Sequence, residues 1–154
     1  MLKYMEAAVV LQEVPDEISL AISISGCPHR CPGCHSAWLQ EDEGMPLLNN
    51  LDKLIDRYPG ISCVCLMGGD QSHDEIGLLC DLIHVRGLKT CFYSGNDTPP
   101  SAKLQEKLDY LKIGPYIQSR GPLSDPNTNQ KFWKKTSDGW EDITYRFLPP
   151  KHLI

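Results

Sequence analysis

Three cysteines lie close together in the short segment Cys27–Cys34, whose sequence is Cys-Pro-His-Arg-Cys-Pro-Gly-Cys. Thiolates are soft ligands that suit zinc and iron–sulfur clusters, and prolines and a glycine shape a loop that can wrap round an inorganic centre. Three thiolates can hold a [4Fe–4S] cluster and leave one iron free for another ligand. The segment therefore predicts a metal site. Two alternatives stay open, namely a zinc site completed by His29 or His35 and a disulfide pair with one spare thiol.

Three further polar loops could contribute to chemistry, and two of them directly follow apolar, strand-like runs. Gly68–Asp70 joins two glycines, which allow a ligand to approach the backbone closely, to a carboxylate that can meet a positive charge. Ser94–Asn96 follows the next such run and offers a hydroxyl. Asn127–Gln130 lies in a loop-like stretch near the C-terminus. An ordinary turn or polar loop explains each of them equally well when it is taken alone.

Strand-like and helix-like patterns alternate along the chain, which predicts parallel strands joined by crossovers with helices outside. Strands are expected at Ala7–Leu11, Ile18–Ile24, Ile61–Met67, Leu88–Tyr93 and Tyr110–Ile113. Helices are expected after an N-cap at Asn49 or Asn50, after Ser72 or Asp74, and at Ala102–Leu108. An Asp-Gly pair between Lys131–Thr136 and Trp140–Phe147 predicts a C-terminal β-hairpin.

The length of the chain limits the fold that these elements can build. At 154 residues it is shorter than the ~200 residues at the low end of closed eight-stranded (β/α) barrels. We therefore expect an α/β fold, a single-domain open partial (β/α) barrel over residues 1–154. The cysteine segment follows the strand at Ile18–Ile24, so it lies at a carboxyl strand end, where α/β enzymes place their chemistry.

Composition narrows the classes of function. A formal charge of −5 without clustered Lys and Arg argues against a nucleic-acid partner. No basic leader and no apolar stretch of ~18 residues is found, so we expect no membrane segment and a cytoplasmic location. Thiols stay reduced in the cytoplasm. We expect the four cysteines outside the loop to be small buried residues, namely Cys63, Cys65, Cys80 and Cys91. A second metal site at Cys63 and Cys65 stays open.

The Cys-x3-Cys-x2-Cys spacing resembles the signature of the radical S-adenosylmethionine (SAM) superfamily. The resemblance implies that Cys27, Cys31 and Cys34 hold a [4Fe–4S] cluster whose free iron chelates SAM. It also implies a fold of the radical SAM type. Gly68, Gly69 and Asp70 resemble the superfamily's Gly-Gly-Glu motif, which implies that Asp70, a shorter substitute for Glu, helps to hold the SAM ammonium.

Two more elements resemble radical SAM activases of glycyl-radical enzymes. Ser94 and Gly95 resemble a Tyr-Thr-Gly element, with Ser in place of Thr, which implies a hydroxyl contact with SAM. Asn129 and Gln130 resemble a Ser-x-Asn-Gln element near the C-terminus of activating proteins for anaerobic ribonucleoside-triphosphate reductases, which implies that they help to bind SAM. The departures are Asp70 for Glu, Ser94 for Thr and a Trp-rich hairpin.

The resemblance to these activating proteins covers nearly the whole chain. It implies reductive cleavage of SAM and abstraction of a hydrogen from one glycine α-carbon of the reductase, which stores a glycyl radical. The implied partners are the anaerobic ribonucleoside-triphosphate reductase and a flavodoxin- or ferredoxin-type electron donor. The alternatives are a compact radical SAM enzyme acting on a small molecule, such as a deazapurine synthase, and a non-catalytic zinc or iron–sulfur adaptor.

Overall fold

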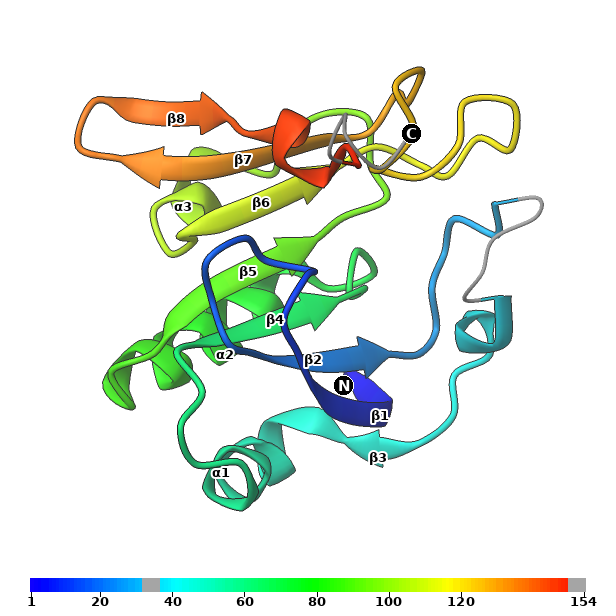
Figure 1. Ribbon diagram of the computed structural model, residues 1–154. Coiled ribbons are helices and arrows are strands. Elements are labelled where there is room, and N and C mark those ends of the chain that lie inside the picture. The colour runs from blue at the N-terminus through cyan, green and yellow to red at the C-terminus, as the bar shows by residue number, and fades with distance from the viewer. Residues whose placement is uncertain (32–36, 150–154) are drawn as a thin grey trace.

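A computed structural model of the protein describes residues 1–31 and 37–149 (Figure 1). Pro32, Gly33 and Cys34 of the cysteine segment, and His35 directly after it, lie outside the described residues. The strands are β1 Lys3–Val10, β2 Ser19–Ile24, β3 Met45–Pro46, β4 Cys63–Met67, β5 Lys89–Tyr93, β6 Tyr110–Ile113, β7 Lys131–Thr136 and β8 Gly139–Asp142. The helices are α1 Leu47–Arg57, α2 His73–Val85 and α3 Ala102–Gln105, with 3-10 helices η1 Ala37–Gln40 and η2 Thr144–Phe147.

All eight strands form one mixed sheet in the order β3-β1-β2-β4-β5-β6-β7-β8. The four central strands β2, β4, β5 and β6 are parallel, whereas the pairs at both ends of the sheet are antiparallel. Within residues 1–31 and 37–149 the edge strands β3 and β8 do not pair with each other, so the sheet is open. The α/β fold, the parallel centre and the β7–β8 hairpin are thus confirmed.

The two faces of the sheet carry two separate apolar clusters, because successive side chains of a strand point to opposite faces. The face toward the helices buries Leu20, Ile22, Leu66 and Phe92 against α1 and α2. The opposite face, here called the inner face, is covered by the connection between β1 and β2, which crosses in front of β4 and β5 in Figure 1. Val14 in that connection is fully buried.

The four cysteines outside the cysteine segment are all fully buried, which confirms the prediction made for them. Burial raises the pKa of the Cys80 thiol to about 12 and also raises those of Cys63 and Cys91. These groups stay protonated at neutral pH, whereas metal ligands must be thiolates. In the described part of the chain no group of three or more His, Cys, Asp or Glu side chains could hold a metal ion.

Helix α1 begins at Leu47, so the N-cap predicted at Asn49 or Asn50 is wrong. Leu47 and Leu51 are both fully buried, and a helix that starts at Leu47 places these two residues, four apart, on the same face. Asn50 instead donates from Nδ2 to the carbonyl of Pro46 at 2.6 Å. The Ser72 cap is confirmed, because its Oγ accepts from the backbone N–H of Glu75.

Two expected elements near the C-terminal end are shorter than predicted. Helix α3 ends at Gln105 and does not reach Leu108. The second hairpin strand ends at Asp142, whose carboxylate accepts from the backbone and hydroxyl of Thr144 and starts the 3-10 turn η2. A third difference is at the other end, where β1 starts at Lys3. None of the helices in the described residues is long and apolar enough to cross a bilayer.

A buried carboxylate joins three strands at the amino end of the parallel strands. Glu17 accepts at Oε1 from the Ser62 hydroxyl (2.8 Å) and at Oε2 from the Tyr110 hydroxyl (2.5 Å) and the Lys89 ammonium (3.3 Å). Burial and the hydrogen bond to Glu17 raise the pKa of Tyr110, so this hydroxyl remains a donor. The network ties the start of β2 to β4, β5 and β6.

Replacing Tyr110 by Phe should lower the free energy of unfolding by about 1.5–3 kcal/mol, because a buried charged acceptor loses a donor. Urea unfolding at neutral pH measures the change. Tyr145→Phe is the matched control, since Tyr145 is 62% exposed. Equal, small effects of the two substitutions would show that Glu17 does not depend on Tyr110.

Candidate functional site

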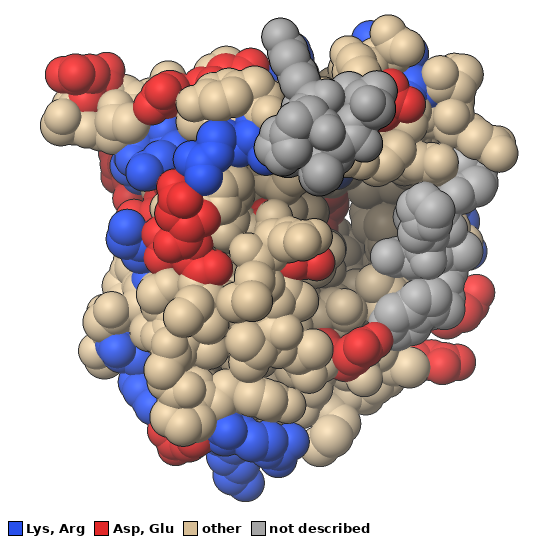
Figure 2. Space-filling model, viewed as in Figure 1, with Lys and Arg blue, Asp and Glu red and all other residues tan. Residues whose placement is uncertain are grey.

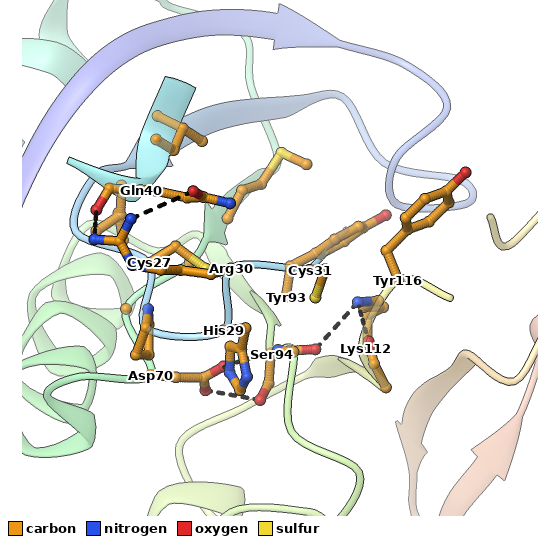
Figure 3. A pocket seen from close by; sticks show the side chains of 18 of the residues that line it. Cys27, His29, Arg30, Cys31, Gln40, Asp70, Tyr93, Ser94, Lys112 and Tyr116 are labelled. Carbon is orange, nitrogen blue, oxygen red and sulfur yellow. Dashed lines mark hydrogen bonds and ion pairs between the residues drawn. The ribbon is translucent and has the colours of Figure 1, made fainter. Parts of the chain in front are cut away.

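The carboxyl ends of β2, β4, β5 and β6 meet at one edge of the sheet, where a pocket opens (Figure 3). Figure 2 shows this edge hollowed in the right half of the view. The structure brings together at this pocket most of the residues that the sequence singled out, because parallel strands deliver their following loops to the same side. They are Cys27, Cys31, Gly68, Gly69, Asp70, Ser94 and Gln130.

Cys27 and Cys31 are free, partly exposed thiols at the pocket. The chain leaves β2 through Gly26, whose φ of +74° lies in the region that favours glycine. The backbone N–H of Gly26 donates to the carbonyl of Glu41 (3.0 Å), and that of Cys27 donates to the carbonyl of Leu39 (3.1 Å). The start of the cysteine segment is thus hydrogen-bonded to residues that follow it. Two accessible soft donors fit the predicted ligand set, whose third member, Cys34, lies outside the described residues.

Asp70 is the most heavily hydrogen-bonded side chain of the pocket, and only 4% of it is exposed. Oδ2 lies 2.6 Å from His29 Nε2 and accepts from the Gly95 backbone N–H at 2.8 Å. Oδ1 lies 2.9 Å from His73 Nε2 and accepts from the Ser94 hydroxyl at 2.7 Å and from Asn96 Nδ2 at 3.3 Å. An ionised carboxylate only accepts, so each of these imidazole nitrogens carries its proton.

The balance of burial and hydrogen bonding sets the charge of Asp70. Burial alone would raise the pKa of this carboxyl, but hydrogen bonds from His73, Ser94, Gly95 and His29 together lower it below its usual value. Asp70 therefore carries a negative charge at neutral pH. A carboxylate offers about four lone-pair sites, and all of them are used by the donors of the protein itself.

The two glycines before Asp70 have packing reasons of their own. Gly68 and Gly69 have φ values of +109° and +105°, which side chains rarely adopt. A Cβ at Gly68 would lie 2.9 Å from the carbonyl oxygen of Ile24, and one at Gly69 would lie 2.5 Å from Cδ1 of Ile76. The glycine pair lets the end of β4 pack against β2 and α2, and its backbone lines the pocket.

Ser94 and the Asn129–Gln130 pair differ in how they relate to the pocket. The Ser94 side chain lines it, but its hydroxyl already donates to Asp70 and accepts from the backbone N–H of Asn96 (3.0 Å). Gln130 lines the pocket, whereas Asn129 is absent from its lining. Asn129 instead donates from Nδ2 to the carbonyl of Pro115 at 2.9 Å, which holds the loop that follows β6.

Two pocket residues make contacts that the sequence did not predict. His29 points at Asp70, and Lys112 lies on the other side of Cys31 in Figure 3. Lys112 is 8% exposed and donates to the carbonyls of Ser94 (3.1 Å) and Gly114 (2.7 Å). A lysine inside the apolar strand β6 is a signal in the sequence that could have marked it, because lysine is almost never fully buried without a partner.

No protein-family model, curated protein or solved structure matches this chain. The assignment of function therefore rests on the residues of the pocket and their geometry.

Replacing Asp70 by Asn should lower the free energy of unfolding by about 3 kcal/mol at neutral pH, because a buried, multiply paired charge is lost. The folded-state pKa of Asp70 lies below the ordinary value of 3.8, so its contribution is present above that value and is lost as the pH falls through the folded pKa. Urea unfolding across this range should show a constant difference between the two proteins near neutrality and a shrinking one in acid.

Asp97→Asn is the control for this experiment, because Asp97 is an exposed carboxylate in the same loop as Asn96. If the two substitutions cost the same, the hydrogen bonds to Asp70 do not stabilise the fold.

Proposed function

We propose that the protein is a radical SAM enzyme that generates a glycyl radical on a protein substrate, the anaerobic ribonucleoside-triphosphate reductase. The observation that carries the proposal is the convergence of Cys27, Cys31 and the Gly68–Asp70 loop on one pocket at the carboxyl edge of the parallel strands. The proposed fold is correspondingly an open partial (β/α) barrel of the radical SAM type. Its setting is the reducing cytoplasm, where the thiols are free to bind a metal.

In this proposal the cysteine segment binds the cluster. Cys27, Cys31 and Cys34 would bind a [4Fe–4S] cluster as thiolates, with one iron left for SAM. A bound cluster would supply one-electron reduction of SAM, with the electron coming from a flavodoxin- or ferredoxin-type donor, and the hydrogen atom would come from a glycine of the protein substrate. The contrast between accessible Cys27 and Cys31 and the buried cysteines of the inner face supports this assignment.

In this proposal the other pocket residues orient SAM and exclude water. The charge of Asp70 lies beside the pocket and favours the cationic sulfonium and ammonium groups of SAM. Because both oxygens of Asp70 already accept hydrogen bonds, a direct contact with the ammonium would replace one of the present donors. The contacts of Ser94 and Gln130 with SAM, and a supporting role of Asn129 in the loop beside them, belong to the same proposal.

A second, more open groove leads away from the pocket, which supports a protein substrate. The two share five lining residues, namely Met67, Tyr93, Lys112, Tyr116 and Gln130. Gln12 and Glu13 of the connection over the inner face line the groove, together with residues 122–124. Ligand pockets usually bury most of a small molecule, whereas an open groove suits an inserted protein loop.

Each single substitution to Ala, at Cys27, Cys31 or Cys34, should abolish binding of the [4Fe–4S] cluster. The reason is that no other accessible thiol in the described residues lies at this edge. Anaerobic reconstitution with iron and sulfide, followed by iron analysis and absorbance, measures the loss. Zinc would be colourless and would point to the adaptor alternative.

Cys80→Ala is the matched control, because Cys80 is fully buried in α2 and should cost only packing energy, about 1–3 kcal/mol. Four iron atoms per chain in a variant that lacks all three segment cysteines would contradict the assigned ligands.

The complete chain with reconstituted cluster should cleave SAM slowly by itself and form a glycyl radical when a cognate anaerobic reductase and a reductant are added. The partner closes the open groove and excludes solutes that quench radicals. Electron paramagnetic resonance of the mixture detects the radical as a doublet, and a reductase with Ala in place of its radical glycine is the control. Stoichiometric use of SAM with a small metabolite, without any doublet, would favour the small-molecule alternative.

A further inference from the structure

The imidazole of His29 lies in a small socket formed by Asp70 and Gly95. Its Nε2 is 2.6 Å from Asp70 Oδ2, and 22% of its side chain is exposed. A Cβ added to Gly95 would lie 2.7 Å from His29 Cδ2 and 3.0 Å from both Cγ and Nε2. The flat ring therefore packs directly on the backbone of Gly95, with its donor on the carboxylate.

Glycine is needed at position 95 for this contact and not for backbone strain. Gly95 lies outside the positive-φ region that favours glycine, unlike Gly68 and Gly69. The nearest atoms to a Cβ there all belong to the His29 ring. An alanine would be compatible with the backbone φ, and its closest contacts would be with that ring.

The socket is built by residues that do not depend on His29. Asp70 is fixed by the His73 ring, the Ser94 hydroxyl and the Gly95 backbone N–H. These donors come from the start of α2 and from the loop after β5. The socket is therefore preformed, and what it receives is the middle of the Cys27–Cys31 segment.

We propose that His29 is a positioning residue that docks the cysteine segment onto the loops after β4 and β5, and so fixes the two thiols that flank it. The adjacent Arg30 has a φ of +49°, so the backbone turns directly after the docked ring. Residues that orient metal ligands commonly affect affinity for the metal as strongly as 10–100-fold. The effect on the cluster rests on the proposed function, whereas the docking is a property of the chain itself.

The docking is tested by nuclear magnetic resonance of the imidazole N–H groups in the full chain without iron. The unaltered protein should show protected Nε2–H signals for both His29 and His73, because each donates to the buried carboxylate. Gly95→Ala should remove the His29 signal and keep that of His73. Gly77→Ala is the matched control, since its Cβ would meet its nearest neighbour, Lys107 Nζ, at an ordinary 3.6 Å.

The positioning role is tested on protein reconstituted with iron and sulfide, by the rate at which a ferrous chelator removes iron. Gly95→Ala and His29→Ala should both raise that rate by about 10-fold or more. His29→Gln keeps a donor that can reach Asp70 and should restore part of the retention. Gly77→Ala should leave the rate unchanged.

Each outcome bears on a separate statement. An unchanged His29 signal in Gly95→Ala would overturn the docking. Loss of that signal with unchanged iron release would overturn the positioning role. Failure of the unaltered chain to bind iron would overturn both the proposed function and the positioning role, and the two histidine signals would still report whether His29 is docked.

Discussion

A single buried carboxylate sets the arrangement of the candidate site. Moving an ionised group out of water is costly unless hydrogen bonds replace its hydration. Asp70 obtains those bonds from three separate segments: the cysteine segment, the start of α2 and the loop after β5. The start of α2 and the loop after β5 fix the carboxylate, and the cysteine segment completes its burial by adding the His29 donor. The hydrogen bonds that replace the hydration of Asp70 are therefore the same contacts that hold the walls of the pocket together.

The sheet makes that convergence possible before any polar contact forms. Met67 at the end of β4 is paired with Ser23 of β2 on one side and with Tyr93 of β5 on the other, so three loops start at one level. Gly68 and Gly69 then turn the chain without a Cβ where Ile24 and Ile76 approach. Apolar packing and strand register place the loops, and Asp70 fixes them to one another.

The sequence was sufficient for those parts of the site that depend on spacing and periodicity, as the positions of Cys27, Cys31 and Asp70 at one edge illustrate. It was insufficient where a side chain is used by a partner distant in the sequence. The sequence did not predict that Ser94, after β5, donates its hydroxyl to Asp70, after β4. The start of α1 was misplaced for a similar reason, because burial of Leu47 outweighed local capping propensity. Neither the Ser94–Asp70 hydrogen bond nor the burial of Leu47 can be recognised from the residues next to it in the sequence.

Burial divides the cysteines in the described part of the chain into two chemical kinds. On the inner face, Cys63 and Cys91 lie among apolar and aromatic neighbours, and burial raises the pKa of both thiols, so they are poor ligands and poor nucleophiles. Cys27 and Cys31 lie beyond the end of β2, partly exposed beside a pocket. The proposed iron–sulfur function needs some of the seven thiols to bind iron and the others to stay unbound. Burial of Cys63, Cys65 and Cys91 in the sheet, and of Cys80 in α2, makes that distinction through packing.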